Sequence, residues 1–293
     1  MNNLPLDFKN NLLVLIDGHA LIHRAFHALP PLTNRNGQKI GAVYGFLRIF
    51  FKVLKEYHPE YVVVAFDSPG PTFRHNIFPE YKATRAKTPD ELNQQIPLIK
   101  KAVAVLGFSI LEIKGLEADD LIGTLAKKID KEIQKIIVTG DTDLLQLADE
   151  NIKIVLLQKG ISQYRLFGPV EIKEKYQGLA PRQLVELKGL KGDSSDNLPG
   201  IPGIGEKIGR DLLIQFENLE NIYENLEDIS PRIREKLITY KEQSFLSRRL
   251  GLICQDAPIN ESLENYRQTS YNEKEVINFL TEIGLKSLIK ALP

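Results

Sequence analysis

The sequence predicts an α/β domain with a mostly parallel sheet, followed by a helical domain. In the first half of the chain, short apolar runs alternate with amphipathic stretches. Most of these runs are continuously apolar, as strands buried on both faces should be. The strand signal then ends near residue 180. We therefore expect an α/β unit over residues 1–180 and a helical unit over residues 181–293.

Five runs have the length and composition of buried strands. They are LLVLI (12–16), YVVVAF (61–66), FSILEI (108–113), KIIVT (135–139) and IKIVLL (152–157). Between them, residues 42–57 and 118–129 carry apolar side chains at helical spacing. Such alternation is typical of a parallel sheet with helices on both faces.

One insertion, residues 68–101, interrupts the alternation and carries a local excess of basic side chains. Its TPDE segment predicts a helix start, with Thr88 as the cap, Pro89 at the first helical position and Glu91 closing a capping box. Pro97 should kink or restart this helix. The rest of the chain is simpler, because the stretches 181–190, 207–216, 231–253 and 274–292 all show helical periodicity.

Composition excludes several classes of protein. The 43% hydrophobic and 26% charged content is that of an ordinary soluble protein. The single cysteine, Cys254, excludes an intramolecular disulfide and a cysteine-based zinc site. The apolar run at 11–17 is too short for a membrane span, so we expect a cytoplasmic protein. Formal net charge is zero, which argues mildly against a nucleic-acid binder, although local patches matter more than totals.

Acidic residues follow the predicted strands at their carboxyl ends, which share one edge of an open parallel sheet. The first, second and fourth strands end in LID, AFD and TGDTD, and EADD begins the helix after the third strand. The stretch KGDSSDNLPGIPGIGEKIG adds two more acids. The nine carboxylates are those of Asp17, Asp67, Glu117, Asp119, Asp120, Asp141, Asp143, Asp193 and Asp196.

Each acid taken alone is explained as a helix cap, a turn residue or a complement to a helix dipole. Nine together are not, because packed like charges repel unless cations neutralise them. Ligand sets made only of oxygen suit Mg²⁺ or Mn²⁺, and no histidine is placed among these acids as zinc would prefer. Two such ions are the standard device for phosphodiester hydrolysis, so the sequence predicts a metal-dependent phosphoryl-transfer site.

The segment TFRHNIFPEYKATR interleaves aromatic and basic side chains. Arg74, Phe78 and Tyr81 form a pattern that binds single-stranded nucleic acid, with cations for phosphates and aromatic faces for bases. An amphipathic flap whose aromatics pack on the core would show the same pattern. Because the insertion starts directly after the second strand, we expect it to overhang the acids, with Lys82 or Arg85 stabilising charge on the scissile phosphate.

The glycine-rich stretch GIPGIG predicts a turn between two helices. Gly200, Gly203 and Gly205 would let backbone N–H groups approach a phosphate closely, at the start of a helix. Lys207 and Arg210 would add positive charge to the same phosphate run. A tight helix–helix turn also uses glycine, but it requires fewer. We therefore expect this turn to hold duplex backbone without reading sequence.

Seven motifs together resemble the 5′-nuclease (5′→3′ exonuclease) domain of bacterial DNA polymerase I, within the flap endonuclease superfamily. They are DGHALIHRAFHAL, AVYGF, AFD, FRHNIFPEYKATR, EADD, TGDTDLLQL and GDSSDNLPGIPGIGEKIG, and they span essentially the whole chain in family order. The resemblance implies a PIN-like α/β core, a helical arch at 68–101 and a helix–three-turn–helix module that binds duplex DNA.

The resemblance also implies roles for individual residues. One metal group would comprise Asp17, Asp67, Glu117, Asp119 and Asp120, and a second Asp141, Asp143, Asp193 and Asp196. Lys82 and Arg85 match the catalytic basic residues of the arch, and Arg24 matches a basic residue near the site. Gly203, Gly205 and Lys207 match the hairpin that holds duplex phosphate, where the family also binds K⁺.

The expected function is divalent-metal-dependent cleavage of 5′ flaps and 5′ ends near single-strand/duplex junctions, in primer and flap removal during replication and repair. The partners would be such DNA, an RNA/DNA primer, and a polymerase domain in cis or in trans, with the nuclease itself monomeric. A catalytically inactive junction-binding protein of the same fold is one alternative, and a small-molecule phosphatase is another. The balance of exonuclease and flap activity, and the preferred metal, are left open.

Overall fold

The computed structural model describes residues 11–259 and 262–293, and its centre is a six-stranded sheet in the order β3-β2-β1-β4-β5-β6. The first five strands are parallel, and β6 runs antiparallel to β5. The strands are β1 (Leu12–Asp17), β2 (Tyr61–Ala65), β3 (Ser109–Leu111), β4 (Gln134–Thr139), β5 (Ile152–Leu157) and β6 (Tyr164–Phe167). The predicted α/β class is confirmed. The short, half-buried edge strand β6 was not predicted.

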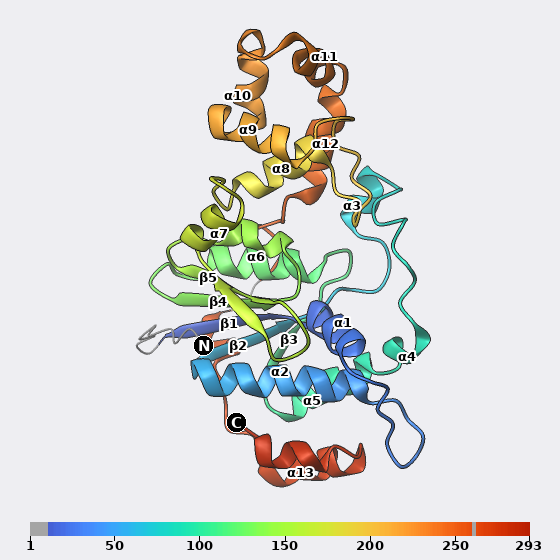
Figure 1. Ribbon diagram of the computed structural model, residues 1–293. Coiled ribbons are helices and arrows are strands. Elements are labelled where there is room, and N and C mark those ends of the chain that lie inside the picture. The colour runs from blue at the N-terminus through green and yellow to red at the C-terminus, as the bar shows by residue number, and fades with distance from the viewer. Residues whose placement is uncertain (1–10, 260–261) are drawn as a thin grey trace.

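Helices cover both faces of the sheet (Figure 1). On one face lie α1 (Gly18–Ala28), α2 (Gly41–Tyr57) and α5 (Ile96–Val105). On the other lie α6 (Ala118–Lys128) and the 3₁₀ helix η1 (Asp143–Leu147). Successive strand side chains point to opposite faces, so β1 supplies alternate residues to the two cores.

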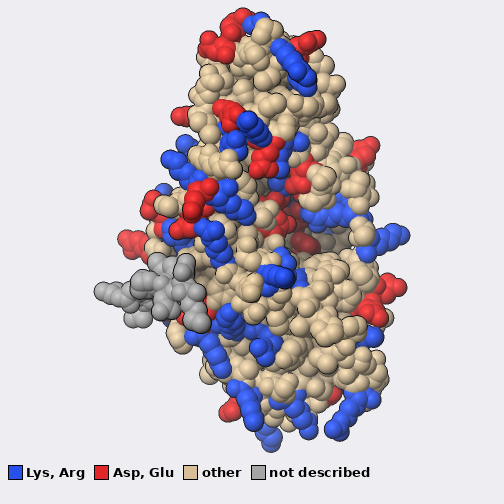
Figure 2. All heavy atoms as spheres, viewed as in Figure 1, with Lys and Arg blue, Asp and Glu red and all other residues tan. Residues whose placement is uncertain are grey.

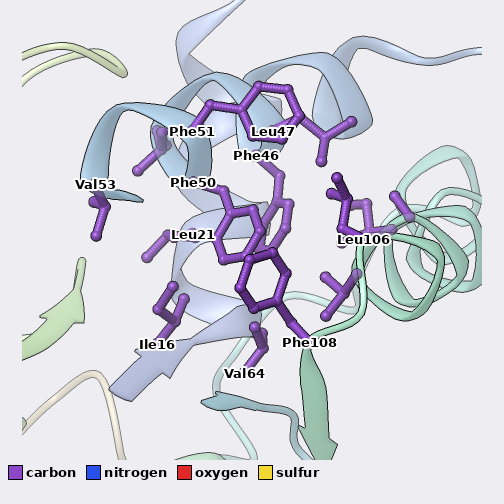
Figure 3. Close-up of a cluster of buried hydrophobic side chains, with 14 of the residues drawn as sticks. Ile16, Leu21, Phe46, Leu47, Phe50, Phe51, Val53, Val64, Leu106 and Phe108 are labelled. Atoms are coloured by element: carbon purple, nitrogen blue, oxygen red, sulfur yellow. The ribbon is translucent and has the colours of Figure 1, made fainter. Parts of the chain in front are cut away.

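The larger core packs α2 against the sheet through a cluster of aromatic side chains (Figure 3). Phe50 meets Phe108 edge to face with ring centroids 4.9 Å apart, and Phe46 stacks on Phe50. Ile16 and Val64 close the cluster from the strands. Full burial of each such side chain contributes about 1.5–3 kcal/mol, which anchors β1 and Asp17 at its carboxyl end.

The insertion holds two short helices, α3 (Phe73–Ile77) and α4 (Asp90–Asn93). The predicted capping of the second is wrong: Pro89, not Thr88, is the N-cap residue, and no side chain caps the helix. The extended backbone of Pro89 places helical geometry one residue later than expected. Pro97 restarts the chain as α5, as predicted.

A helical unit rises above the sheet in Figure 1. It contains α8 (Gln183–Lys191), α9 (Glu206–Phe216), α10 (Leu219–Glu224), α11 (Pro231–Thr239) and α12 (Lys241–Gly251), with the 3₁₀ helix η2 (Leu226–Asp228). The helix α7 (Pro169–Lys175) connects it to β6. Its own core includes Leu190, Ile204, Leu213 and Leu237.

The expected range of 181–293 placed the end of the chain in that helical unit. In the structure, the end of the chain packs elsewhere. The 3₁₀ helix η3 (Leu263–Tyr266), α13 (Glu273–Glu282) and the 3₁₀ helix η4 (Lys286–Ala291) return to the α/β core. Val276, Phe279 and Leu280 are buried in the same cluster as α2 and α5, at the opposite end of the molecule from α9 (Figure 1). Helical periodicity identifies these segments but not the surface on which they pack. Among the described residues, none of the helices has the length and apolarity needed to cross a membrane.

Candidate active site

Two acids stand at the carboxyl ends of the central strands. Asp17 ends β1, where its carboxylate accepts hydrogen bonds from the Ala20 backbone N–H (3.0 Å) and the Thr139 hydroxyl (2.8 Å). Asp67 follows β2, and its Oδ1 accepts the Ala118 N–H at 2.8 Å. Both therefore cap helices, yet both also line a cavity of about 820 Å³ at this edge of the sheet. Asp17 and Asp67 can therefore both cap a helix and take part in a site.

The start of α6 brings three acids to the same edge. Glu117 is the N-cap residue, and its N–H is bound by Asp120 in a capping box. Glu117 and Asp119 line the cavity beside Asp141. Asp120 does not, because it is fully buried and both of its oxygens bind the Arg74 guanidinium at 2.8 Å.

The loop between α8 and α9 carries Asp193 and Asp196 from the helical unit to the sheet. With Asp143, which follows β4, these residues offer carboxylate oxygens that lie within 4.8 Å of one another. Asp196 is buried, and Asp193 lines a smaller cavity of about 240 Å³. Asp141 lines both cavities, so the two groups of acids adjoin. Figure 2 shows acidic side chains recessed in a hollow in the middle of the molecule, with basic side chains at its rim.

The acids differ in charge environment. Burial, together with the charges of neighbouring acids, raises the pKa of Asp17 to about 7 and that of Asp143 to about 6. Burial and the same repulsion raise the pKa of Asp119 well above its usual range. Although burial opposes it, the Lys188 ammonium and Ser195 lower the pKa of Asp193 to about 2. Nearby basic side chains therefore neutralise only part of the negative charge of the cluster, and added cations would stabilise its ionised carboxylates.

The insertion places two cations over the acids. Lys82 Nζ donates to Glu117 at 2.8 Å, and Arg85 donates to Asp196 at 2.5 Å. Lys82 has a left-handed backbone (φ 56°), and its N–H donates to the Asp196 carbonyl. Both side chains line the large cavity, as does Arg24, which donates to the Leu157 carbonyl.

Other predicted residues of the insertion contact the protein's own groups. Arg74 is only 2% exposed and donates to the Leu250 and Leu252 carbonyls besides Asp120. Tyr81 is 3% exposed and donates to Glu117, and Phe78 packs beside it. Arg74 and Tyr81 are thus buried against the protein's own groups and Phe78 is half-buried, and their role in binding DNA stays a prediction. The pattern fits an amphipathic segment whose apolar side chains pack inward.

The glycine-rich turn is shaped by two kinds of glycine. Gly200 is tightly enclosed, because a Cβ there would lie 2.1 Å from the Gly192 nitrogen, and its φ is +57°. Gly205, at the start of α9, has open space where a Cβ would point. Lys207 is exposed beside it, whereas Arg210 donates to Gln177 at 2.6 Å. The open backbone around Gly205 thus lies at the surface, at the N-terminus of a helix.

Sequence reasoning missed two groups of side chains at the site. Lys188, on α8, contacts both Asp143 and Asp193. His19, His23 and His27 lie on one face of α1 at four-residue spacing and line the large cavity. The histidine spacing was visible in DGHALIHRAFHAL, but nothing in the sequence placed Lys188, whose partners lie 45 and 5 residues away.

The donor set fits hard divalent cations. It consists of carboxylate oxygens, three of which lie within 4.8 Å of one another, and the raised pKa values of Asp17 and Asp143 fit a site that added positive charge would stabilise. The residues that line the cavities and could hold such ions are Asp17, Asp67, Glu117, Asp119, Asp141, Asp143 and Asp193, with Asp196 behind Arg85.

Comparison with known families matches nearly the whole chain. Residues 12–177 match the model of a 5′–3′ exonuclease N-terminal resolvase-like domain, and residues 179–274 match a 5′–3′ exonuclease C-terminal SAM fold. DNA polymerase I of Bacillus subtilis (strain 168) is 42% identical over 282 residues, which are 96% of this chain and 32% of that protein. DNA polymerase I of Chloroflexus aurantiacus is 42% identical over 290 residues, 96% and 31% of the two chains. This chain therefore spans about a third of the length of these relatives.

Solved structures share the fold. T5 5′-exonuclease with bound zinc superposes with a TM-score of 0.67 at 21% identity, covering 95% of this chain and 96% of the other. The catalytic core of Rad2 in complex with DNA substrate gives 0.65 at 17% identity, covering 99% and 94%. Flap endonuclease-1 from Methanococcus jannaschii gives 0.62 at 18% identity, covering 97% and 91%.

Proposed function

Because this chain belongs to the 5′–3′ exonuclease family, we propose that it is a divalent-metal-dependent 5′ nuclease that cleaves DNA at 5′ ends and 5′ flaps near single-strand/duplex junctions. The observation that carries the proposal is the meeting of two groups of carboxylates at one edge of the sheet, beneath Lys82 and Arg85. An acid cluster of this kind suits phosphodiester hydrolysis, where charge develops on the phosphoryl oxygens.

Two Mg²⁺ or Mn²⁺ ions, when bound, would supply an activated water and neutralise charge on the scissile phosphate. The carboxylates of Asp17, Asp119 and Asp141 would hold one ion, and those of Asp143 and Asp193 the other. Asp141 lines both cavities, and we place it with the first group, whereas the resemblance implied the second. Asp67 and Glu117 would complete the first group, and Asp196 the second. Asp120, bound to Arg74, would act by positioning the start of α6.

When substrate and ions enter, Lys82 and Arg85 would exchange their ion pairs with Glu117 and Asp196 for hydrogen bonds to the phosphate. Both are cationic donors at the cavity wall, and charge-assisted hydrogen bonds to a transition state are worth far more in a dehydrated site than in water. Arg24, which also lines the large cavity, would hold a neighbouring phosphate.

The duplex would lie against the turn before α9. Exposed N–H groups around Gly203 and Gly205, and the charge of Lys207, suit a phosphate backbone, and a K⁺ ion bound to this turn would join the two. We further propose a bacterial, cytoplasmic enzyme that acts as a monomer on DNA flaps and RNA/DNA primers, with a polymerase domain as its partner in cis or in trans.

The test is cleavage of a 5′-labelled flap substrate in Mg²⁺ or in EDTA. The wild-type chain should release short labelled products only with the metal, and Asp141→Ala/Asp143→Ala should bind the substrate without cutting it. Glu150→Ala, which removes an exposed acid outside both cavities, is the matched control and should cut normally. Tight flap binding with no cleavage in any divalent metal would instead indicate a junction-binding protein, and hydrolysis of nucleoside monophosphates alone would indicate a phosphatase.

A further inference from the structure

Lys188 lies between the carboxylates of Asp143 and Asp193. It projects from the last turn of α8, and its Nζ is 2.6 Å from an Asp193 oxygen and also contacts Asp143. The side chain is only 13% exposed. Its aliphatic stem passes Gly251 of α12, where a Cβ would come within 3.2 Å of the Lys188 Cδ. Packing along the stem and ion pairs at the ammonium therefore hold the side chain in place.

The two groups of acids differ in their share of cations. Within the described part of the chain, Lys82 pairs with Glu117 of the first group, but Asp17, Asp119 and Asp141 form no ion pair with a lysine or arginine. Asp143 and Asp193 share Lys188, and Asp196 has Arg85. A divalent ion that enters between Asp17, Asp119 and Asp141 meets three carboxylates with no ion pair to a lysine or arginine, whereas one that enters between Asp143 and Asp193 meets the Lys188 ammonium that both carboxylates contact.

The geometry points to Lys188 as a resident counter-ion that occupies the second metal position and sets how tightly an ion binds there. This inference rests on the proposed metal-dependent function. Lys188 neutralises Asp143 and Asp193 while the ion is absent, and it must move aside when the ion binds. An ammonium about 4 Å from a divalent cation repels it, so the second ion binds more weakly than the first.

The opposite role is that of a positioning residue, which would hold Asp143 and Asp193 in place for the metal. The two roles make opposite predictions for the removal of the charge. Loss of a competitor strengthens binding of the second ion, and loss of a positioning contact weakens it. Arginine keeps the charge and should behave like the wild type in either case.

The experiment is a titration of the full chain with Mn²⁺ in the absence of DNA. Calorimetry measures the heat of binding, and electron paramagnetic resonance measures the free Mn²⁺. The variants are Lys188→Met, Lys188→Gln and Lys188→Arg. Lys127→Met is the matched control, because Lys127 is an exposed lysine in the last turn of α6 and lines neither cavity. Melting temperatures in EDTA identify any variant that fails to fold, and Lys188→Gln then replaces Lys188→Met.

The wild type should bind one Mn²⁺ tightly and a second more weakly. Lys188→Met should tighten the second by about tenfold and leave the first unchanged, while Lys188→Arg and Lys127→Met match the wild type. An unchanged or weakened second ion in Lys188→Met overturns the inference and leaves the proposed function standing. Absence of any Mn²⁺ binding in the wild type would overturn the two-metal function itself, and the inference with it.

Discussion

Arg74 and Asp120 form a buried, two-pronged ion pair, with both N–O distances at 2.8 Å. The pair joins three parts of the molecule. Arg74 comes from the insertion, Asp120 from the first turn of α6, and the Arg74 guanidinium also donates to the Leu250 and Leu252 carbonyls at the end of α12. Asp120 further accepts the Cys254 N–H. The pair thus links the start of the insertion, the acids of α6 and the helical unit.

Removing one partner of this pair should destabilise the protein strongly. Arg74→Met leaves the Asp120 carboxylate buried without its cation, at an expected cost of about 3 kcal/mol in the free energy of unfolding. The comparison is Arg165→Met, which breaks an exposed ion pair with Glu174 and should cost less than about 0.5 kcal/mol. Urea unfolding in EDTA measures both. Equal, small losses of unfolding free energy would show that the Arg74–Asp120 pair does not stabilise the contact between the insertion, α6 and α12.

Charge on the arch should matter for the rate of cleavage more than for DNA binding. Lys82→Ala and Arg85→Ala should each slow single-turnover flap cleavage by about 100-fold, because each removes a donor to the developing phosphate charge. Lys87→Ala is the control, since Lys87 is exposed and lines neither cavity. If Lys82→Ala and Lys87→Ala lowered the rate alike, Lys82 would act only through general electrostatic attraction.

The metal-free protein should lose stability as pH rises. In the folded state the pKa of Asp17 is raised to about 7 and that of Asp143 to about 6, whereas in the unfolded chain both lie near 3.8. Between about pH 4 and pH 7 the folded state therefore binds more protons than the unfolded state, and the free energy of unfolding falls as pH increases. Melting temperatures in EDTA from pH 5 to 8 should decline accordingly.

Saturating Mg²⁺ should reverse that trend. Protons and metal ions compete for the same carboxylates, so metal affinity, and with it the stabilisation, rises with pH over this range. The matched measurement is the difference in melting temperature with and without Mg²⁺ at each pH. A difference that did not grow from pH 5 to pH 7 would contradict the assignment of these acids to the metal site.

The two glycines of the turn should respond differently to alanine. Gly200→Ala should destabilise the helical unit, because its Cβ would collide with the Gly192 backbone at a positive φ. Gly205→Ala should leave the melting temperature unchanged, since its Cβ points into open space, but should weaken duplex binding by obstructing the approach of a phosphate. Gel-shift titration and thermal unfolding separate the two effects.

Lys207→Ala should weaken duplex binding uniformly across DNA sequences. Loss of one phosphate contact should reduce the slope of log affinity against log salt by about 1. The comparison is Lys274→Ala, a charge loss on α13 at the other end of the molecule (Figure 1). A salt slope unchanged in both variants would remove Lys207 from the DNA surface.

Strand positions and the edge that carries the acids could be predicted because both depend on local patterns. A continuously apolar run specifies a buried strand, and an acid directly after it must lie at the strand's carboxyl end. In a parallel sheet these ends lie at the same edge, so the sequence alone places Asp17, Asp67 and Asp141 together. The edge strand β6 escaped prediction because three of its four residues are exposed or partly exposed and it shows no continuous apolar run.

By itself, then, the sequence determined the class of fold, the acidic edge of the sheet and the glycine turn between two helices. Only the tertiary structure decided which cation each acid meets: Arg74 for Asp120, Lys188 for Asp143 and Asp193, Arg85 for Asp196. It also decided that α13 packs on α2 and α5 and not on the helical unit. Periodicity reports which face of an element is apolar, whereas ion pairing and packing between distant segments depend on distances that only the folded chain defines.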